Sequence, residues 1–414
     1  MREHHAADRG ATVKVSPLGS ICSIVNGGTP KSGVGEYWGG DIAWLTPAEM
    51  GKRESPHIAA TARTITLAGL NNSSAKLIPP GSVILSTRAP IGHLAINETP
   101  MSFNQGCRGI VPSDAVDTKF LYYFLLYSRD ALNALGTGTT FKELAASKLS
   151  AFPVPHPPLQ EQRRIVAILD EAFAGIAIAN ANAERNMANA QALLDSTAQK
   201  MFSESGSWKR LTLQELLDSD WIISHLDGNH GENYPRQDEF VDAGVPYISA
   251  SCLKNGTVDL TIAKFLSEEK SSTIKKGIAR NGDVIFAHNA TVGPVAILET
   301  AEEKVILSTS VTYYRCNNKH ILPNYLAHYM RSFDFRSQYE RVMRQSTRNQ
   351  VPITKQREFF HVIPPMNDQT RISGVLDGLE GEVKILMRAY RAKLLALTEL
   401  KQSLLQKAFA GELH

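Results

Sequence analysis

Two loops rich in hydrogen-bond donors contain the residues with the clearest potential for binding chemistry. The first spans residues 136–142, and its candidates are Thr137, Thr139, Thr140 and Lys142. The second spans residues 344–350, and its candidates are Arg344, Gln345, Ser346, Thr347, Arg348 and Asn349. Arginine and lysine bind guanine edges or phosphates, asparagine and glutamine bind adenine edges, and hydroxyls bind phosphates. Both loops therefore have side chains suited to contact with DNA.

Further polar residues in other turns extend this candidate set. In the first half of the chain they are Thr29, Lys31, Arg88, Asn104 and Gln105. In the second half they are Asn289 and the Ser-Thr-Ser run at 308–310. A single loop of this kind is more typical of ordinary solvated surface. The two main loops occupy the same place in two copies of a repeat, with Thr140 aligned to Thr347, and this favours a shared binding role.

The sequence contains no motif for catalysis. It lacks the Gly-x-x-x-x-Gly-Lys-Ser/Thr loop, the Gly-x-Gly-x-x-Gly fingerprint and the Gly-x-Ser-x-Gly elbow. An amino-methyltransferase should show Asn/Asp-Pro-Pro-aromatic, but none of the Pro-Pro pairs at 79–80, 157–158 and 364–365 has these neighbours. The histidines and the four cysteines have no metal-ligand spacing. We therefore predict no catalytic residues, no metal and no cofactor.

Composition sets the class of protein and leaves the function open. A chain of 414 residues is too long for one ordinary core, so two or more domains are expected. At 43% hydrophobic and 21% charged residues, it is typical of soluble globular proteins. A net charge of +3 permits nucleic-acid binding without demonstrating it. There is no 18-residue apolar run and no signal sequence, so we expect a cytoplasmic protein with reduced cysteines and no membrane span.

One stretch of the chain occurs twice and organises the rest. Pro-Pro-Leu-Gln-Glu-Gln-Arg-Arg-Ile at 157–165 matches Pro-Pro-Met-Asn-Asp-Gln-Thr-Arg-Ile at 364–372, a shift of 207 residues. The run Gly-Ser-Val-Ile-Leu-Ser at 81–86 matches Gly-Asp-Val-Ile-Phe-Ala at 282–287, a shift of 201. Such a period is too long for a solenoid and indicates a duplicated unit of globular domain plus helix.

Both copies predict a long helix that begins at the Pro-Pro pair, since proline is tolerated in a first turn. Apolar or small residues recur at steps of three and four, which is the seam of a coiled coil. In the first copy the seam is Ile165, Leu169, Ala172, Ile176, Ala179, Ala183, Asn186, Ala190, Leu193 and Thr197. In the second it is Ile372, Leu376, Leu379, Val383, Leu386, Tyr390, Lys393, Leu397, Leu400 and Leu404. Each helix of roughly 44 residues would be about 66 Å long.

We therefore predict an α+β fold with two mixed α/β domains at 1–156 and 206–363. Long helices at 157–205 and 364–414 would join them as an antiparallel coiled coil with internal pseudo-two-fold symmetry. The globular parts match poorly outside a few anchors, which is expected if their surfaces bind different things. A coiled-coil adaptor would need no such divergence. An enzyme with an unrecognised motif is the other alternative.

The chain resembles the specificity subunit of type I restriction–modification enzymes. The resemblance rests on the Gly-Gly-Thr-Pro loop at 27–30, the doubled Pro-Pro-x-x-x-Gln-x-Arg-Ile openings, the paired helices and the Gln-Lys-Ala-Phe-Ala-Gly-Glu-Leu segment at 406–413. It implies two target-recognition domains, each reading half of a bipartite, asymmetric site in double-stranded DNA. The helices would set the spacing and dock two methyltransferase subunits. Because the second half lacks the Gly-Gly-Thr-Pro loop, the role of that loop carries over to the first half only.

The resemblance also implies that the chain is not itself an enzyme. Methylation with S-adenosylmethionine and ATP-driven cleavage would lie in the methyltransferase and the restriction/translocase subunits. The chain would then need no cofactor.

Overall fold

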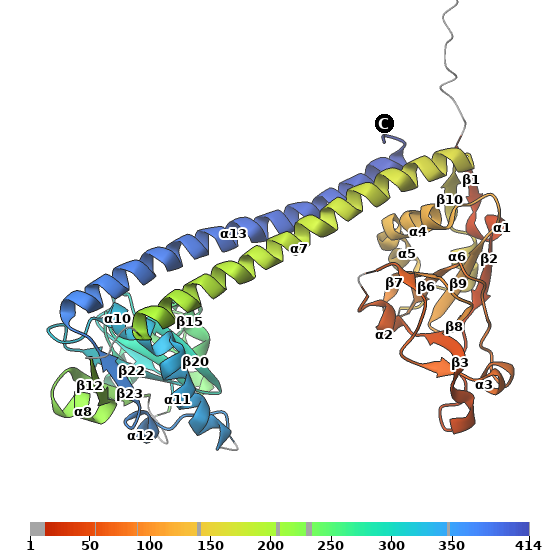
Figure 1. Cartoon of the computed structure of the whole chain (residues 1–414). Coiled ribbons are helices and arrows are strands. Elements are labelled where there is room, and N and C mark those ends of the chain that lie inside the picture. Colours follow the sequence, from red (N-terminus) through yellow and green to blue (C-terminus); the bar gives the residue numbers. More distant parts are fainter. Residues whose placement is uncertain are drawn as a thin grey trace, which may run out of the picture. The chain divides into compact units, whose positions relative to one another are not determined.

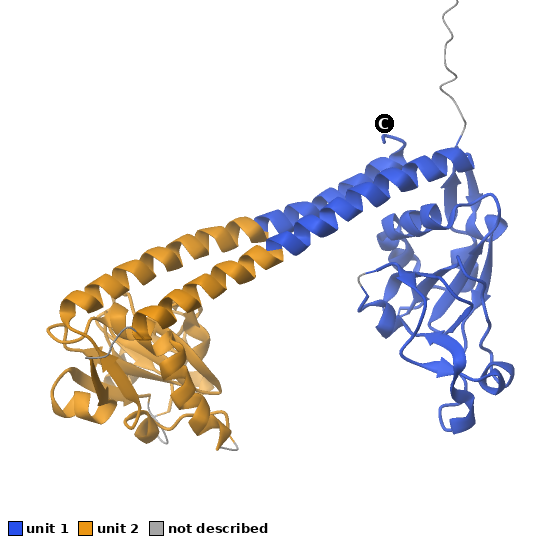
Figure 2. Ribbon diagram, viewed as in Figure 1, with its two compact units in different colours: residues 1–183, 392–414 blue, residues 184–391 orange. Residues whose placement is uncertain are grey.

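The computed structural model describes residues 13–53, 55–88, 90–138, 142–203, 208–228, 234–345 and 348–413. The chain divides into two compact units (Figure 2). Unit 1 contains residues 1–183 and 392–414, and unit 2 contains residues 184–391. Two helices of 45 residues each, α7 (Leu159–Ser203) and α13 (Met366–Ala410), contribute to both units.

Unit 1 is built on a five-stranded sheet with the order β2-β9-β6-β7-β4 (Figure 1). Its strands are β2 (Cys22–Asn26), β9 (Cys107–Pro112), β6 (Val83–Thr87), β7 (Ile91–Asn97) and β4 (His57–Ile58). Strand β6 is buried along its whole length. Because side chains alternate along a strand, Val83 and Leu85 enter one apolar cluster while Ile84 enters another on the opposite face.

Smaller elements complete unit 1. A three-stranded sheet has the order β5-β3-β8, formed by β5 (Thr64–Ile65), β3 (Trp38–Leu45) and β8 (Met101–Phe103). Strand β1 (Lys14–Pro17) pairs with β10 (Pro153–His156), directly ahead of α7. The short helices are α1 (Leu18–Ile21), α2 (Pro47–Met50), α3 (Leu67–Asn71), α4 (Thr118–Tyr127), α5 (Arg129–Leu135) and α6 (Ala146–Ser150). Residues of α4 and α5 join Val83 and Leu85 in one cluster, so these helices cover that face of the sheet.

Unit 2 repeats this plan with a six-stranded sheet in the order β12-β22-β19-β20-β16-β15. Its strands are β12 (Ile222–Asp227), β22 (Val311–Cys316), β19 (Val284–Asn289), β20 (Thr291–Ile297), β16 (Thr257–Val258) and β15 (Leu253–Lys254). Strand β19 corresponds to β6. Its residues Val284 and Phe286 enter one cluster, whereas Ile285 and Ala287 enter another.

The second sheet of unit 2 and the strand pair ahead of its long helix also have counterparts in unit 1, although this sheet has two more strands. A five-stranded sheet has the order β13-β17-β14-β21-β18, formed by β13 (Phe240–Val241), β17 (Lys264–Leu266), β14 (Val245–Ile248), β21 (Val305–Leu307) and β18 (Ile278–Ala279). Strand β11 (Lys209–Thr212) pairs with β23 (Phe360–Ile363), directly ahead of α13. The helices are α8 (Leu213–Asp218), α9 (Glu268–Thr273), α10 (Pro323–Arg331), α11 (Phe333–Arg344) and α12 (Ile353–Gln356).

An aspartate ties the start of each long helix to the globular part of its unit. In unit 1, Asp170 of α7 accepts hydrogen bonds from Lys119 Nζ at 2.7 Å and from the Tyr123 hydroxyl at 2.5 Å, both on α4. In unit 2, Asp377 of α13 lies 2.7 Å from His328 Nε2 on α10. The two aspartates are 207 residues apart, so the repeat seen in the sequence preserves the same anchor.

The end of each long helix packs in the unit opposite to the one in which the helix starts. Phe409, near the end of α13, lies edge-on to Phe120 of α4 with ring centroids 5.4 Å apart in unit 1. Phe202, near the end of α7, lies edge-on to Tyr329 of α10 at 5.6 Å in unit 2. Within each unit the two helices are therefore antiparallel. The predicted α+β fold, its duplicated domains and its paired long helices are confirmed.

The predicted seam of α7 is buried at seven-residue steps from Leu169 to Ala190 and then drifts. Ile176, Ala183 and Ala190 are buried at heptad spacing. Leu193 was expected to continue the seam, but its side chain is 56% exposed and the next residue, Leu194, packs against the core of unit 2 instead. An α-helix has 3.6 residues per turn, so residues spaced by seven gradually turn away from the contact between two straight helices.

The alanine-rich part of α7 is long and apolar enough to cross a membrane by length and composition alone. A mostly buried core helix of a water-soluble protein can pass the same test, whereas 22% of this stretch is buried. The buried residues of α7 pack in the apolar clusters of both units, as helix pairing requires.

Candidate nucleic-acid interface

Three segments distant in sequence meet in unit 1 at the end of the β6–β7 hairpin. The Thr87 N–H donates to the Gly106 carbonyl at 2.7 Å, and the Leu144 N–H donates to the Thr87 carbonyl at 2.9 Å. Backbone hydrogen bonds thus join the hairpin, the turn before β9 and the loop before α6. We call this meeting of Thr87, Gly106 and Leu144 the loop junction of unit 1.

Unit 2 contains the same junction. The His288 N–H donates to the Ser310 carbonyl at 3.0 Å, and the Val351 N–H donates to the His288 carbonyl at 2.8 Å. These residues follow their counterparts in unit 1 by 201, 204 and 207 positions. The growing shift reflects short insertions between the three segments, while the hydrogen bonds that join them are retained.

A glycine from the end of the first sheet strand closes each junction. A Cβ on Gly27 would lie 2.1 Å from the Asn104 carbonyl oxygen, and a Cβ on Gly228 would lie 2.3 Å from the Leu307 carbonyl oxygen. Only glycine permits such an approach. The Gly-Gly-Thr-Pro loop is confined to the first half of the chain, yet one of its glycines does recur, at a shift of 201. The same shift of 201 relates the β6 and β19 segments, so the sequence repeat could have predicted that Gly228 corresponds to Gly27.

Three predicted residues of unit 1 form one hydrogen-bonded group beside the junction. The Thr29 hydroxyl donates to Gln105 Oε1, and Asn104 Nδ2 donates to Thr29 Oγ1 at 3.0 Å. Asn104 Oδ1 in turn accepts the Gly106 N–H at 2.8 Å, which fixes the amide relative to the junction. Gln105 is exposed, so its amide group can reach a ligand in solvent.

Two arginines share one carboxylate next to this group. Arg88 Nη1 lies 3.6 Å from Glu143 Oε2, and Arg108 Nη2 lies 3.8 Å from Glu143 Oε1. These distances are long for ion pairs, so the Arg88 guanidinium keeps donors available for another acceptor. Arg108 is mostly buried, and its Nη1 donates to the carbonyls of Gln105 and Cys107 at 3.0 Å. The local charge is one positive unit in excess. Thr137 pairs with Glu143 through two backbone hydrogen bonds of 2.9 and 3.0 Å.

The other predicted residues of unit 1 form no group of their own among the residues that the structure describes. Lys31, Thr137 and Lys142 are exposed. Thr139 and Thr140 lie outside the described residues. Arg108 and Glu143 were missed by the sequence analysis because neither belongs to a donor-rich run. The proximity of Glu143 to the predicted Lys142 was the available signal.

Predicted residues also meet at the junction of unit 2. Asn289 forms a backbone bridge with Gln350, and Asn349 Nδ2 donates to the Ala290 carbonyl at 2.6 Å. Ala290 has φ +64°, so the hairpin tip turns sharply against the loop that contains Asn349.

The cationic part of this loop lies at the surface. Arg344 is the last residue of α11, and its side chain is exposed, as are those of Gln345 and Arg348. Ser346 and Thr347 lie outside the described residues.

A buried polar network contacts the junction of unit 2 through Val351. Gln356 of α12 is fully buried, and its Oε1 accepts the hydroxyls of Thr312 at 3.1 Å and Tyr314 at 3.0 Å. His225 Nε2 lies 3.1 Å from the same oxygen, and Gln356 Nε2 donates to the Val351 carbonyl at 3.2 Å. In unit 1 the corresponding position is the apolar Leu149. The network was not predicted, because its members are scattered along the sequence.

Burial keeps two histidines of this region neutral. Removal from water lowers the pKa of His225 to about 3, although the hydrogen bond to Gln356 acts in the opposite direction. Burial likewise lowers the pKa of His361 to about 4. These groups are structural, because a buried neutral imidazole behind the loops is not available to a ligand.

Neither the thiols nor a carboxylate–histidine cluster forms a reactive site. All four cysteines are buried, and burial raises the pKa of Cys22 and of Cys107 to about 12. His328, Asp377 and Glu380 have ligand atoms within 4.8 Å of one another. Glu380 is already paired with cations, however, and His328 with Asp377 forms the helix anchor. The exposed amides, hydroxyls and guanidinium groups at the two junctions instead suit base edges and phosphates.

Solved structures share this fold. A chain from a structure described as "Structural basis underlying complex assembly and conformational transition of the type I R-M system" superimposes with a TM-score of 0.77 at 19% identity, covering 97% of this chain and 98% of that one. The HsdS subunit from Thermoanaerobacter tengcongensis superimposes with a TM-score of 0.57 at 18% identity, covering 99% of both chains.

Sequence comparison adds the family. The type I restriction enzyme MjaIX specificity subunit of Methanocaldococcus jannaschii is 28% identical over 289 residues, which are 66% of this chain and 65% of that protein. The chain thus aligns with slightly less than two-thirds of this relative's length. Residues 11–185 and 208–394 both match the family described as "Type I restriction modification DNA specificity domain". The two matches fall on the two halves of the repeat and together cover most of the sequence, so the chain belongs to this family.

Proposed function

We propose that the chain is the non-catalytic DNA-recognition subunit of a type I restriction–modification complex. Each unit would read one half of a bipartite, asymmetric site in double-stranded DNA. The observation that supports this most strongly is the duplicated loop junction. One backbone arrangement recurs in both units, but it presents different side chains, as two readers of different sequences require.

The side chains at the two junctions suggest how the reading is divided. In unit 1 the amides of Asn104 and Gln105 suit an adenine edge, while Arg88 suits guanine or phosphate. In unit 2 Arg344 and Arg348 provide the cations and Asn349 an amide. Lys31 and Lys142 are assigned to phosphates, because a flexible ammonium is a point charge without bidentate geometry.

Selection from random duplex DNA tests the bipartite reading. The full chain, bound to its modification subunits, should enrich two short fixed segments separated by a spacer of constant length. The double substitution Asn104→Ala/Gln105→Ala should relax one segment only, and Arg344→Ala/Arg348→Ala should relax only the other. A structural adaptor would enrich no sequence. Relaxation of both segments by one double variant would contradict the division of reading between the units.

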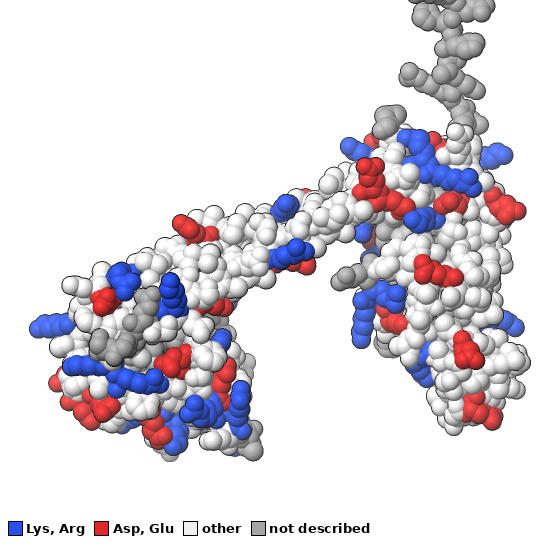
Figure 3. All heavy atoms as spheres, viewed as in Figure 1, with Lys and Arg blue, Asp and Glu red and all other residues white. Residues whose placement is uncertain are grey.

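We further propose that the long helices dock two methyltransferase subunits. Large apolar side chains remain exposed on them, including Ile178, Leu193, Ile385 and Leu395 at 56–69% exposure. In unit 2 a groove of about 390 Å³ is lined by Leu193, Leu379, Leu386 and Tyr390. Few charges lie along the middle of both helices on the face shown in Figure 3. Exposed apolar surface of this kind is typical of a protein–protein interface.

Assembly with the modification subunits tests this docking surface. Leu193→Glu places a charge in the apolar groove and should weaken the complex at least tenfold. Gln199→Glu adds a charge at another exposed position of α7 and should leave assembly unchanged. Equal assembly of both variants, measured by analytical ultracentrifugation, would exclude the groove from the interface.

Catalysis belongs to the partner subunits in this proposal. The purified chain should neither methylate nor cleave DNA when S-adenosylmethionine and ATP are supplied. Turnover by a preparation free of partner subunits would overturn the proposal. We place the complex, including its restriction/translocase subunits, in the cytoplasm and away from membranes.

A further inference from the structure

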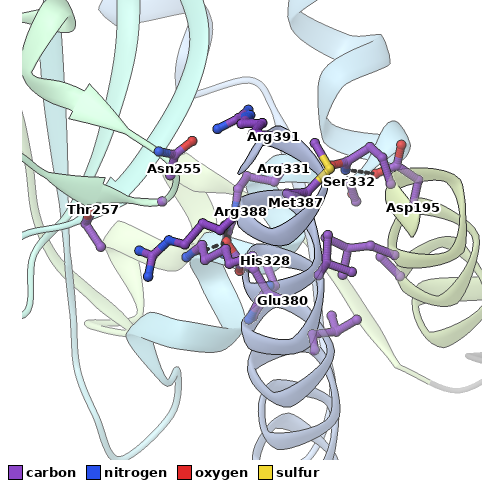
Figure 4. A pocket seen from close by; sticks show the side chains of 17 residues that line it. Asp195, Asn255, Thr257, His328, Arg331, Ser332, Glu380, Met387, Arg388 and Arg391 are labelled. Atoms are coloured by element: carbon purple, nitrogen blue, oxygen red, sulfur yellow. Dashed lines mark hydrogen bonds and ion pairs between the residues drawn. The ribbon is translucent and has the colours of Figure 1, made fainter. Parts of the chain in front are cut away.

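A basic cavity in unit 2 is not used by the proposed DNA reading. It has a volume of about 620 Å³ and lies between α13, α10, the end of α7 and the β15–β16 turn (Figure 4). The cationic residues that line it are Arg331, Lys384, Arg388 and Arg391. Its carboxylates are Asp195 and Glu380, which leaves two positive charges in excess.

Two of the four cationic side chains form ion pairs within the cavity. Arg331 Nη1 lies 3.0 Å from Glu380 Oε1, and Lys384 Nζ lies 3.2 Å from the same oxygen. Arg388 and Arg391, in contrast, are exposed and have no ion pair with any residue that the structure describes. Figure 4 shows both on the side of α13 that faces the β15–β16 turn, with Asp195 on the opposite side of the helix.

The β15–β16 turn, which closes the cavity, lies directly against the ion pair of Arg331 and Glu380. Asn255 and Gly256 have φ values of +52° and +83°. A Cβ on Gly256 would lie 2.8 Å from Arg331 Nη1 and 3.3 Å from Glu380 Oε1. The glycine thus allows the backbone to rest directly on the charged pair, so this wall of the cavity is built into the fold.

The cavity is specific to unit 2. A shift of 207 places Phe173, Ala177, Ala181 and Glu184 of α7 at the positions of Glu380, Lys384, Arg388 and Arg391. The basic character is therefore absent from the corresponding part of α7. This asymmetry indicates a ligand that binds only once per chain.

The position of the cavity argues against a DNA phosphate as its ligand. Thr257, which lines the cavity, pairs with Ile297 at the end of β20, whereas the loop junction lies at the other end, beside Thr291. Six residues of strand separate these ends by about 20 Å. The lining also includes Leu194, Leu376, Val383 and Met387. Apolar walls suit amino-acid side chains better than a hydrated phosphate backbone.

We propose that this cavity binds an acidic segment of a partner protein, with at least two carboxylates directed at Arg388 and Arg391. Arginine binds carboxylates through two parallel hydrogen bonds, and two excess positive charges match two carboxylates. The volume is in the range typical of ligand pockets. This site is separate from the DNA-reading junctions and shares Val383 with the apolar groove near Leu193. Its occupation would distinguish unit 2 from unit 1.

Fluorescence anisotropy with the full-length chain tests the site. The probe is a fluorescein-labelled decapeptide with alternating Asp and Leu residues, and the control probe has Asn in place of Asp. The acidic peptide should bind at low salt and weaken as ionic strength rises. Arg388→Ala/Arg391→Ala should lower its affinity roughly tenfold or more. Lys407→Ala, which removes an exposed cation from another part of α13, should leave the affinity unchanged.

Four results would overturn the proposal. The first is equal binding of the two peptides, and the second is equal peptide affinity of the double variant and the parent chain. The third is displacement of the acidic peptide by inorganic phosphate at constant ionic strength, which would assign the cavity to a small anion. The fourth is a loss of duplex DNA affinity in the double variant as large as its loss of peptide affinity, which would assign the cavity to nucleic acid. Unchanged DNA binding together with lost peptide binding supports the proposal and is independent of the reading assignment.

Discussion

Gln162 and Gln369 make the same three hydrogen bonds from equivalent positions 207 residues apart. The Gln162 amide accepts the Asp117 N–H at 2.8 Å and donates to the carbonyls of Ala115 and Pro157 at 3.0 and 2.8 Å. Gln369 does the same with the Leu322 N–H and two carbonyls at 2.9, 2.8 and 2.9 Å. Both side chains are fully buried. The glutamine of the repeated motif thus clamps the start of each long helix to the loop before α4 or α10.

Replacing either glutamine by methionine should destabilise its own unit. The volume is similar, but backbone groups in the loop lose their partners, which costs roughly 1–3 kcal/mol per unsatisfied group. Gln162→Met and Gln369→Met should therefore lower the free energy of unfolding by similar amounts, as measured by denaturant titration. Gln160→Met, at an exposed position two residues away, should change it by less than about 0.5 kcal/mol. An equal effect at position 160 would disprove the clamp.

Unit 2 should lose more stability in mild acid than unit 1. His225 and His361 have folded pKa values of about 3 and 4, whereas an unfolded histidine titrates near about 6.5. Between about pH 4 and 6 the unfolded chain binds more protons than the folded chain. Stability should therefore fall as the pH is lowered, by about 1.4 kcal/mol per pH unit for each histidine.

Hydrogen exchange across this pH range separates the two units within the intact chain. The positions in unit 1 that correspond to His225 and His361 are Ile24 and Val154, which do not titrate. Burial also lowers the pKa of His93 in unit 1, but the two histidines of unit 2 have the larger shifts. After correction for intrinsic exchange rates, opening should therefore increase more in unit 2 than in unit 1 as the pH is lowered. His361→Leu should reduce that pH dependence by about half. The same dependence in both units would show that other groups dominate.

Arg344 should contribute a phosphate or base contact in the second half-site. If it contacts phosphate, Arg344→Ala should lower affinity for all sequences and reduce the slope of log K against log salt by about 0.9. If it reads a guanine, the loss should be roughly 1–3 kcal/mol and restricted to the matching sequence. Arg336→Ala is the control, since Arg336 lies on the same helix and faces Glu340 at 3.7 Å. Unchanged binding in Arg344→Ala would exclude this end of α11 from the interface.

Glu143 should limit non-specific binding by unit 1. Its carboxylate lies between Arg88 and Arg108 and repels DNA phosphates. Glu143→Gln keeps the shape and the backbone pairing with Thr137 but removes the charge. Affinity for unrelated duplexes should rise several-fold, by about 1 kcal/mol, and discrimination should fall. Glu171→Gln, an exposed carboxylate of α7, serves as the control, and an equal rise there would indicate a simple effect of net charge.

The long helices and the central strands could be predicted because their causes are local or repeated. The Pro-Pro pairs directly precede α7 and α13, and the apolar run Val83-Ile84-Leu85 recurs as Val284-Ile285-Phe286. Continuous apolar residues indicate a strand buried on both faces, as β6 and β19 are. The seam position of Leu193 was wrong, because helical drift brings Leu194 to the core instead.

The loop junctions could not be predicted, because backbone groups form them. Thr87, Gly106 and Leu144 meet through N–H and carbonyl groups that nearly every residue possesses, so their identities contain no signal. The buried network of unit 2 is equally hidden, since Gln356 stands where unit 1 has Leu149 and its partners are scattered along the sequence. The donor-rich loops were visible because polar residues follow one another in the sequence.

The packing of the end of α13 determines which unit is completed first during synthesis. Unit 2 is one continuous stretch, residues 184–391, whereas unit 1 combines residues 1–183 with residues 392–414. Phe120 and Tyr123 of α4 share an apolar cluster with Leu405 and Ala408 near the end of α13. A ribosome releases these last residues only after the whole of unit 2 has emerged. The half of the protein that is translated first is therefore the half that is completed last, and until then its aromatic surface needs shielding from other nascent chains.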